Sequence, residues 1–169
     1  MHKLIATLGL ATALTLSASS GFAKDQPGQK FIVKAVQGNL AEVQMGELAQ
    51  EKGASDGVKS FGRMLQADHS AANQQATAAA AAIGVTPPTE PSKKQKADYA
   101  RMSKLSGAAF DSHFVKHMVD DHKKDIAAYQ KESKKQDGQV SQYAGATLPT
   151  LQKHLETAQS LAKGASRTQ

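Results

Sequence analysis

The chain has 169 residues and a formal net charge of +6 at pH 7, and it contains no cysteine. The absence of cysteine excludes disulfides, thiolate metal sites and a lipid-modified cysteine. Basic residues are interleaved with acidic ones and aromatic residues make up only 5%, so we expect no binding to nucleic acid. The short lysine clusters are expected to be solvated faces, with weak contact to anionic envelope components as the functional alternative.

The first 23 residues have the pattern of a secretory signal peptide. Met1-His2-Lys3 precede an apolar run at residues 4–18, and small residues stand at positions −3 and −1 of a cleavage site after Ala23. The apolar run is shorter than a membrane-spanning helix requires, although a retained N-terminal anchor is the alternative. We therefore expect cleavage of residues 1–23, a periplasmic location, and a mature domain of residues 24–169 without a transmembrane segment.

Helix signals dominate the remaining sequence, and strand signals are almost absent. Apolar residues recur at helical spacing over about 30–52 and about 56–83. Gly53 and Gly84 are stop signals for these two helices, and Ser55 offers an N-cap for the second. The segment 84–91 contains three prolines and cannot continue a helix.

Three further helices are expected after this proline-rich segment. The first is short and lysine-rich, at about 92–105, and the second is long, at about 108–135. Asp137 and Gly138 predict a turn before the last helix, at about 140–163. Pro149 lies within that last helix and should kink it or divide it in two.

Four long amphipathic helices predict an all-α protein that folds as a four-helix bundle. The connection between the second and third long helices is much longer than the other two, long enough to run the length of the bundle. This favours a ferritin-like arrangement with a long crossover between helices 2 and 3. Alternatively, the short helix could lie across one end of the bundle.

Two segments on the second and third long helices share the pattern Phe-x-(Arg/Lys)-x-(Leu/Met)-x-x-Asp-His. The first runs from Phe61 to His69 and the second from Phe114 to His122. In each segment the phenylalanine, the large apolar residue and the aspartate fall at i, i+4 and i+7, on one face of a helix. An acid and an imidazole on an inward face need a polar partner, so the pattern predicts a polar site inside the bundle.

Acids and imidazoles occupy the middle of all four long helices, where helices of similar length reach one level. Such side chains could bind zinc, iron, manganese or copper. Adjacent aspartate and histidine side chains point about 100° apart, so His69 and His122 are predicted either as ligands or as residues that orient the ligands. The candidate metal ligands are Glu42, Asp68, His69, His117, Asp121, His122 and His154.

Two other functions are compatible with the same residues. Buried acids paired with neighbouring histidines or lysines could serve only to fix helix packing, in a non-catalytic structural or interaction protein of the envelope. A di-iron oxidoreductase would need carboxylate bridges, which only Glu42, Asp68 and Asp121 could supply, and the Glu-x-x-His pairs of such proteins are absent. We assign no catalytic residue.

The motifs occur in order along all four long helices, and together they resemble one bacterial family, called domain of unknown function 4142. The resemblance covers nearly all of the mature chain, and it implies a ferritin-like fold and export. We interpret the chain as an exported helical-bundle protein that binds a transition metal, in metal handling or oxidative-stress protection. The resemblance rests on Phe31-Ile-Val-Lys-Ala35, Asn39-Leu-Ala-Glu42-Val43, Gly46-Glu47-Leu48-Ala49, Asp68-His69, Phe110-Asp111, Met118-Val-Asp-Asp121-His122 and Leu148-Pro149-x-Leu151-x-x-His154-Leu155.

Overall fold

A computed structural model describes residues 26–136 and 138–165, so the predicted signal peptide lies outside the described residues. The predicted all-α class is confirmed, because no β-strand occurs in these two ranges and only an isolated bridge joins Gly53 to Gly107. Five helices are counted where a four-helix bundle is predicted, so the ferritin-like description stays a prediction. The helices are α1 (Gln29–Lys52), α2 (Asp56–Ala82), α3 (Lys93–Met102), α4 (Gly107–Ser133) and α5 (Gln139–Ala165).

The helix ends follow the capping residues of the sequence. The Ser55 side chain accepts a hydrogen bond from the backbone N–H of Val58, so α2 begins at the residue after Ser55. Ser92 and Gln95 form a reciprocal capping box at the start of α3. Pro149 lies inside α5, which is a single helix of 27 residues, so the predicted division does not occur.

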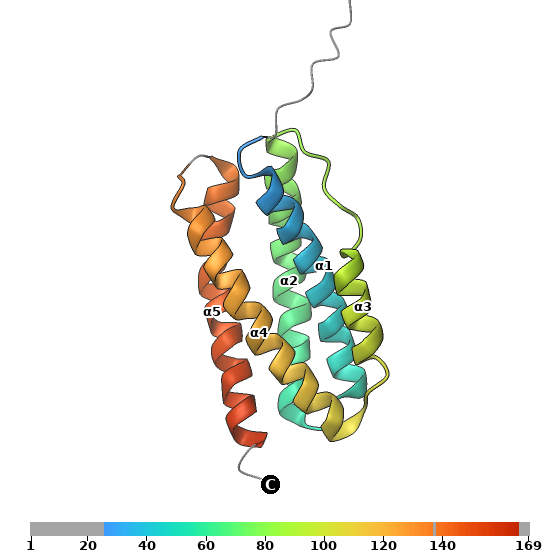
Figure 1. Ribbon diagram of the computed structural model, residues 1–169. Coiled ribbons are helices and arrows are strands. Elements are labelled where there is room, and N and C mark those ends of the chain that lie inside the picture. Colours follow the sequence, from blue (N-terminus) through green and yellow to red (C-terminus); the bar gives the residue numbers. More distant parts are fainter. Residues whose placement is uncertain (1–25, 137, 166–169) are drawn as a thin grey trace, which may run out of the picture.

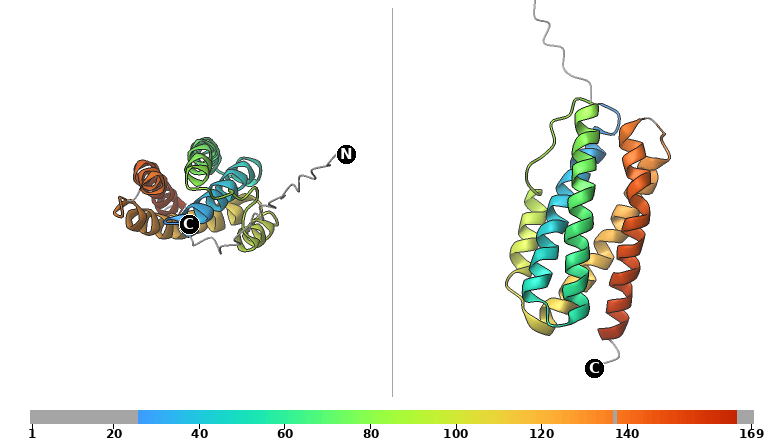
Figure 2. Two further views of the ribbon diagram at one scale, coloured as in Figure 1. Left: turned by 90° about the horizontal axis from the view of Figure 1, so that it is seen from above. Right: turned by 180° about the vertical axis from the view of Figure 1, so that it is seen from behind.

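The four long helices form two antiparallel hairpins, α1–α2 and α4–α5, that pack side by side (Figure 1, Figure 2). After α2, the chain returns beside α1 through α3 to the end of the molecule where α2 began (Figure 1). At that end, the Asp111 carboxylate of α4 accepts hydrogen bonds of 2.9 Å from the backbone N–H groups of Ala54 and Ser55. This contact ties the second hairpin to the turn of the first.

Ring contacts between α2 and α4 show that these two helices run in the same direction. The ring centroids of Phe61 and Phe114 are 6.0 Å apart, and those of His69 and His122 are 5.9 Å apart. The histidine follows the phenylalanine by eight residues in both helices, so both pairs can meet only if the helices are parallel. The two Asp-His segments therefore face each other in the same register.

Helices α1 and α2 approach each other closely at two glycines. A Cβ atom on Gly46 would lie 2.5 Å from the carbonyl oxygen of Gly62, and a Cβ on Gly62 would lie 2.6 Å from that of Gly46. No side chain fits at either position unless the helices separate. Among the described residues, no helix combines the length and the apolar character that a membrane span requires.

The apolar core consists of two clusters, and a polar layer separates them along every long helix. One cluster contains Phe61, Phe110 and Phe114, and the other contains Ile32 and Leu151. The polar layer comprises buried side chains that stand between the two clusters in the order of each helix: Asn39, Glu42, His69, His122 and His154. The fold thus brings polar groups from α1, α2, α4 and α5 to one level.

Candidate metal centre

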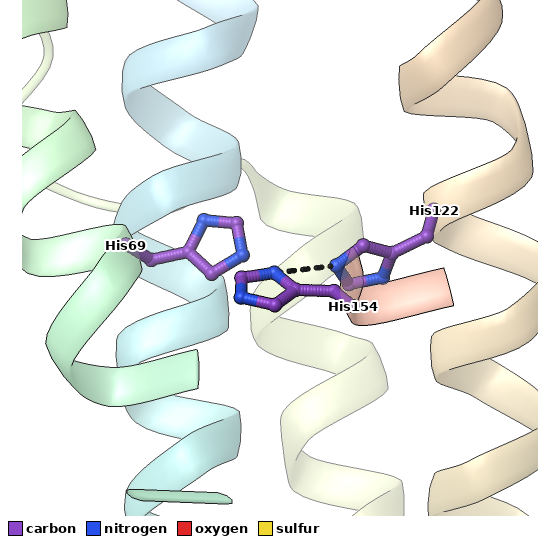
Figure 3. A group of neighbouring side chains, drawn as sticks. All are labelled: His69, His122 and His154. Atoms are coloured by element: carbon purple, nitrogen blue, oxygen red, sulfur yellow. Dashed lines mark hydrogen bonds between the residues drawn. The ribbon is translucent and has the colours of Figure 1, made fainter. Parts of the chain in front are cut away.

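Three buried histidines from three helices point toward one another in the polar layer (Figure 3). His69 of α2, His122 of α4 and His154 of α5 are at most 3% exposed. One nitrogen from each ring lies within 4.8 Å of the corresponding nitrogens of the other two. Within the described part of the chain, no other set of three histidine, aspartate or glutamate side chains brings its ligand atoms this close. We call these three residues the histidine cluster.

Each imidazole continues the apolar stripe of its own helix. His69 follows the buried Leu65 by four residues, and His122 follows the buried Met118 by four. His154 follows a buried leucine by three residues. Residues three or four apart share a helix face, so the same geometry that buries the apolar side chains turns all three rings inward.

Oxygen acceptors hold the outer nitrogens of two of the rings. His122 Nδ1 lies 3.0 Å from the backbone carbonyl oxygen of Met118, and His154 Nε2 lies 2.8 Å from Oδ2 of Asp68. A carbonyl and a carboxylate can only accept, so these two ring nitrogens carry the protons of the neutral imidazoles. The inner nitrogens, His122 Nε2 and His154 Nδ1, are therefore lone-pair acceptors.

These two inner nitrogens are 3.3 Å apart (Figure 3). Two acceptors at this distance share no proton unless one ring takes up a second proton or releases its outer hydrogen bond. Burial, reinforced by the His154 ring, lowers the pKa of His122 to about 4, and burial also lowers the pKa of His154. A second proton is therefore unfavourable near neutral pH, whereas a cation would satisfy both lone pairs.

The third ring has the same arrangement. His69 Nδ1 lies 2.9 Å from Oδ1 of Asn39, whose Nδ2 donates to the Tyr143 hydroxyl at 3.0 Å. With the amide in this orientation, His69 Nδ1 carries the proton and Nε2 faces the other two rings. His69 Nε2 is buried and has no hydrogen-bond partner in the part of the chain that the structure describes. Burial, together with His122 and His154, lowers the pKa of His69 well below its ordinary value.

The histidine cluster has the chemistry of a metal site. Around a tetrahedral ion with nitrogen ligands at about 2.0–2.1 Å, the ligand nitrogens lie about 3.3 Å apart, which is the separation already found between His122 and His154. Three neutral imidazoles suit zinc, copper or iron, and they leave a fourth position open. These three side chains could therefore form a metal site.

The other candidate ligands lie in two places. Asp68 has a side chain that is 38% exposed, and it stands behind the His154 ring as a hydrogen-bond acceptor. Glu42, His117 and Asp121 line a cavity of about 350 Å³ between α1, α3 and α4. Of the seven side chains predicted as ligands, the structure thus brings three together, places one behind them and turns three toward a cavity.

This cavity, which we call the acidic pocket, is lined by carboxylates of three helices. They are Glu42 of α1, Asp98 of α3, and Asp121 and Asp125 of α4. Burial raises the pKa of Glu42 well above its ordinary value, and the charges of Asp121 and Asp125 raise it further. Burial, with Asp121 next to it, also raises the pKa of Asp125 to about 7. Three lysines, Lys34, Lys94 and Lys124, line the same cavity, and Lys94 pairs with Asp98. A positive charge is therefore favourable only close to Glu42, Asp121 and Asp125.

A smaller cavity of about 100 Å³ lies between α1, α2 and α4. Its wall includes Asn39, His69 and Asp125. Lys34, Gly38 and Asp125 line both cavities. The smaller cavity therefore adjoins the acidic pocket and is also in contact with the His69 ring.

Asn39 is a site residue that the sequence reasoning missed. The signal that could have indicated it is an amide in the middle of an otherwise apolar helix face, where it needs a buried partner. The shared Phe-to-His pattern also favours Asp68 and Asp121 over the histidines that follow them. The reason is that it places the residue seven positions after the phenylalanine, the aspartate, on the inward face. Tracing the same face through i+8 leads to His69 and His122.

Comparison with known proteins gives one match. No curated protein and no solved structure matches the chain. A family model described as "Domain of unknown function (DUF4142)" matches residues 13–161, which is most of the 169-residue chain. The match confirms the resemblance seen in the motifs, and the chain belongs to the DUF4142 family.

Proposed function

We propose that the protein binds a divalent transition metal ion through His69, His122 and His154. The observation that supports this most is the set of three inner ring nitrogens, which face one another while Asn39, Met118 and Asp68 oxygens hold the outer nitrogens. Metal-binding histidines commonly donate their second N–H to such oxygens, which fixes the tautomer and the ring orientation. The arrangement is costly without a cation, because buried acceptors then lack donors.

The ligand chemistry narrows the choice of ion. Neutral imidazole nitrogens suit zinc, copper and iron better than manganese, which prefers oxygen ligands. A di-iron centre is less well supported, because Asp68 contacts His154 and is not among the residues that line the acidic pocket with Glu42 and Asp121. We therefore propose a mononuclear site with three nitrogen ligands and an open fourth position.

Export and physiological role are part of the same proposal. The pattern of residues 1–23 and the family resemblance support a periplasmic location, and the parallel α2 and α4 with their long connection support a ferritin-like arrangement. A buried site of three imidazoles suits a protein that holds a metal ion away from solvent. Metal handling or protection from metal-catalysed oxidation is the role that fits this chemistry.

Cobalt titration tests the site directly. Purified protein, with any affinity tag removed, is titrated with Co²⁺, whose visible absorption reports tetrahedral nitrogen coordination. We expect one ion per chain in the wild type and loss of the absorption in His154→Ala. His113→Ala is the matched control, because His113 is an exposed histidine on α4. Absence of the absorption in the wild type, or its persistence in His154→Ala, overturns the proposal.

A second candidate function rests on the 3.3 Å contact between His122 and His154. If one of these two rings carried its proton on the inner nitrogen, His122 and His154 would share a hydrogen bond. That bond would fix the packing of α4 against α5 without a metal, as in a structural protein of the envelope. In that case His154→Ala lowers the melting temperature by the same amount with and without added metal. If added metal raises the melting temperature of the wild type but not that of His154→Ala, the metal site is supported instead.

A further inference from the structure

The acidic pocket differs from the histidine cluster in how its ligand atoms are arranged. Glu42, Asp121 and Asp125 stand around a cavity of about 350 Å³, whereas the three imidazoles converge on one point. Carboxylates spread around a cavity of this size suit a cation that keeps part of its water shell. The pocket is therefore suited to capture a hydrated ion rather than to enclose a bare one.

A buried oxygen on the pocket wall points to a missing positive partner. Glu42 is 3% exposed, and its Oε2 atom has no hydrogen-bond partner among the described residues. Lys34, Lys94 and Lys124 also line the pocket. Lys94 pairs with Asp98 and the charge of Lys124 acts on Asp125, but no lysine among the described residues is hydrogen-bonded to Glu42 Oε2. An unpaired buried carboxyl oxygen is costly, and a cation with bound water supplies both charge and donors.

The two cavities adjoin each other, and together they offer a route from this pocket toward His69. Lys34, Gly38 and Asp125 line both the acidic pocket and the smaller cavity, and His69 and Asn39 also line the smaller cavity. An ion that leaves the acidic pocket along this route passes Asp125 and meets the His69 ring. Its inner nitrogen, Nε2, has no hydrogen-bond partner within residues 26–136 and 138–165.

We infer that the acidic pocket is a loading site, where Glu42, Asp121 and Asp125 capture a hydrated divalent cation and pass it by Asp125 to His69. The inference rests on the proposed function, because it requires the histidine cluster as the final site. Oxygen ligands favour hydrated ions, and imidazole nitrogens favour the transition metal once water is lost. Three lysines on the same wall offset part of the negative charge, so the attraction for a cation is local to the carboxylate oxygens.

Stopped-flow mixing with Co²⁺ tests the inference through the rate of uptake. We expect Glu42→Gln and Asp125→Asn to slow the appearance of the visible absorption by roughly tenfold. The final spectrum should keep its shape, since the histidine ligands remain. Glu51→Gln is the matched control, because Glu51 is an exposed acid on α1 that lines neither cavity. Unchanged rates in both pocket variants overturn the inference.

A steric variant tests the route independently of charge. A Cβ atom on Gly38 would meet only Gln95 Nε2, at 4.0 Å, so the helix accepts a side chain there. Gly38→Leu places a large side chain between the two cavities and should slow Co²⁺ uptake severalfold. Gly38→Ala, with a single methyl group, controls for the change in helix propensity. Equal uptake rates in the leucine and alanine variants overturn the proposed route.

Manganese binding separates failure of the loading site from failure of the histidine cluster. Mn²⁺ prefers oxygen ligands, and its binding is followed by the loss of the free-ion electron paramagnetic resonance signal. We expect the wild type to bind Mn²⁺ and the Glu42→Gln/Asp125→Asn double variant to bind it severalfold more weakly. One outcome overturns the loading site alone. In that outcome the wild type shows tetrahedral Co²⁺ absorption, but neither Mn²⁺ binding nor the rate of Co²⁺ uptake changes when the two acids are replaced. The opposite outcome is Mn²⁺ binding that weakens when the two acids are replaced, in a protein that shows no tetrahedral Co²⁺ absorption. This outcome overturns the histidine site and the delivery step that requires it.

Discussion

The histidine cluster and the acidic pocket are neighbours in the structure, since His122 and Asp121 are consecutive residues, yet they differ in two respects. The histidine cluster is closed and nitrogen-lined, and each of its rings has an oxygen partner on its outer side. The acidic pocket is oxygen-lined, and the buried Oε2 of Glu42 has no partner among the described residues. The first region is organised for one compact ligand, and the second for a looser, hydrated one.

This difference shows how a hydrogen bond on the outer side of a metal-binding side chain limits which ion that side chain can bind. A ring whose outer nitrogen donates to an oxygen has a fixed tautomer and a fixed direction, so its inner nitrogen is always an acceptor. A carboxylate without such support can adjust its position and its protonation. The two regions should therefore respond differently to substitution and to pH.

Removal of one imidazole should abolish metal-dependent stabilisation. At a free metal concentration 100 times the dissociation constant, binding stabilises a protein by about 2.7 kcal/mol. For a chain of this size the melting temperature should rise by about 5–10 °C. His122→Ala should remove this rise, whereas His113→Ala should retain it. Differential scanning calorimetry with and without Zn²⁺ measures both, and a full rise in His122→Ala would falsify the histidine cluster as the ligand set.

The two regions should respond to pH with opposite signs in the metal-free protein. His122 has a pKa of about 4 in the fold and 6.5 as an ordinary histidine, so its contribution is present above pH 6.5 and is lost as the pH falls toward 4. That loss amounts to about 3 kcal/mol. Asp125 has a pKa of about 7 in the fold and 3.8 ordinarily, so its contribution is present below pH 3.8 and is lost as the pH rises toward 7. That loss amounts to about 4 kcal/mol.

Urea unfolding at several pH values separates these two contributions. Asp125→Asn should be more stable than the wild type at pH 8, by up to about 4 kcal/mol, and should lose this advantage near pH 3.5. Glu51→Gln serves as the control, because Glu51 is exposed and outside both cavities. An Asp125→Asn variant that follows the wild-type curve at every pH would show that Asp125 is not destabilised by its surroundings.

Asp68 and Asp121 occupy the same place in the two Asp-His segments, so they give a matched pair of variants. Asp68→Ala removes the acceptor behind His154 and should weaken metal affinity about 10–100-fold. Asp121→Ala changes the wall of the acidic pocket and should weaken equilibrium affinity less. Competition with a chromophoric chelator measures both. Equal losses in the two variants would contradict the separation of the two regions.

The smallest effect is expected at the far end of the hydrogen-bonded chain behind His69. Tyr143→Phe removes the hydroxyl that accepts from Asn39 Nδ2 and that also lies 3.1 Å from the Tyr129 hydroxyl. We expect the free energy of unfolding to fall by about 1–3 kcal/mol, with less than a tenfold change in metal affinity. Urea unfolding measures the first quantity. Tyr99→Phe on α3 is the control, since the Tyr99 hydroxyl makes no hydrogen bond within the described ranges.

Most of the fold could be predicted from the sequence because helix formation depends on local signals. The ends of α1, α2 and α3 fall within a few residues of those predicted from Gly53, Ser55 and Ser92. Pro149 predicts a kink or a division of the last helix, and of these two the division does not occur. Buried residues on both sides of it, Tyr143 and Leu151 among them, belong to the same apolar cluster. Packing of this kind outweighs the local cost of a proline within a helix.

Spacing along one helix is enough to indicate which face of that helix turns inward, because apolar residues three or four apart share a face. His69 lies four residues beyond Leu65 and must share its face. Only the tertiary structure decided which inward groups meet. Asp68 and Asp121 have the same local motif, yet Asp68 contacts His154 of α5 and Asp121 lines the pocket with Glu42 of α1. The direction of each carboxylate depends on which helix lies beside it, and no pattern within one helix contains that information.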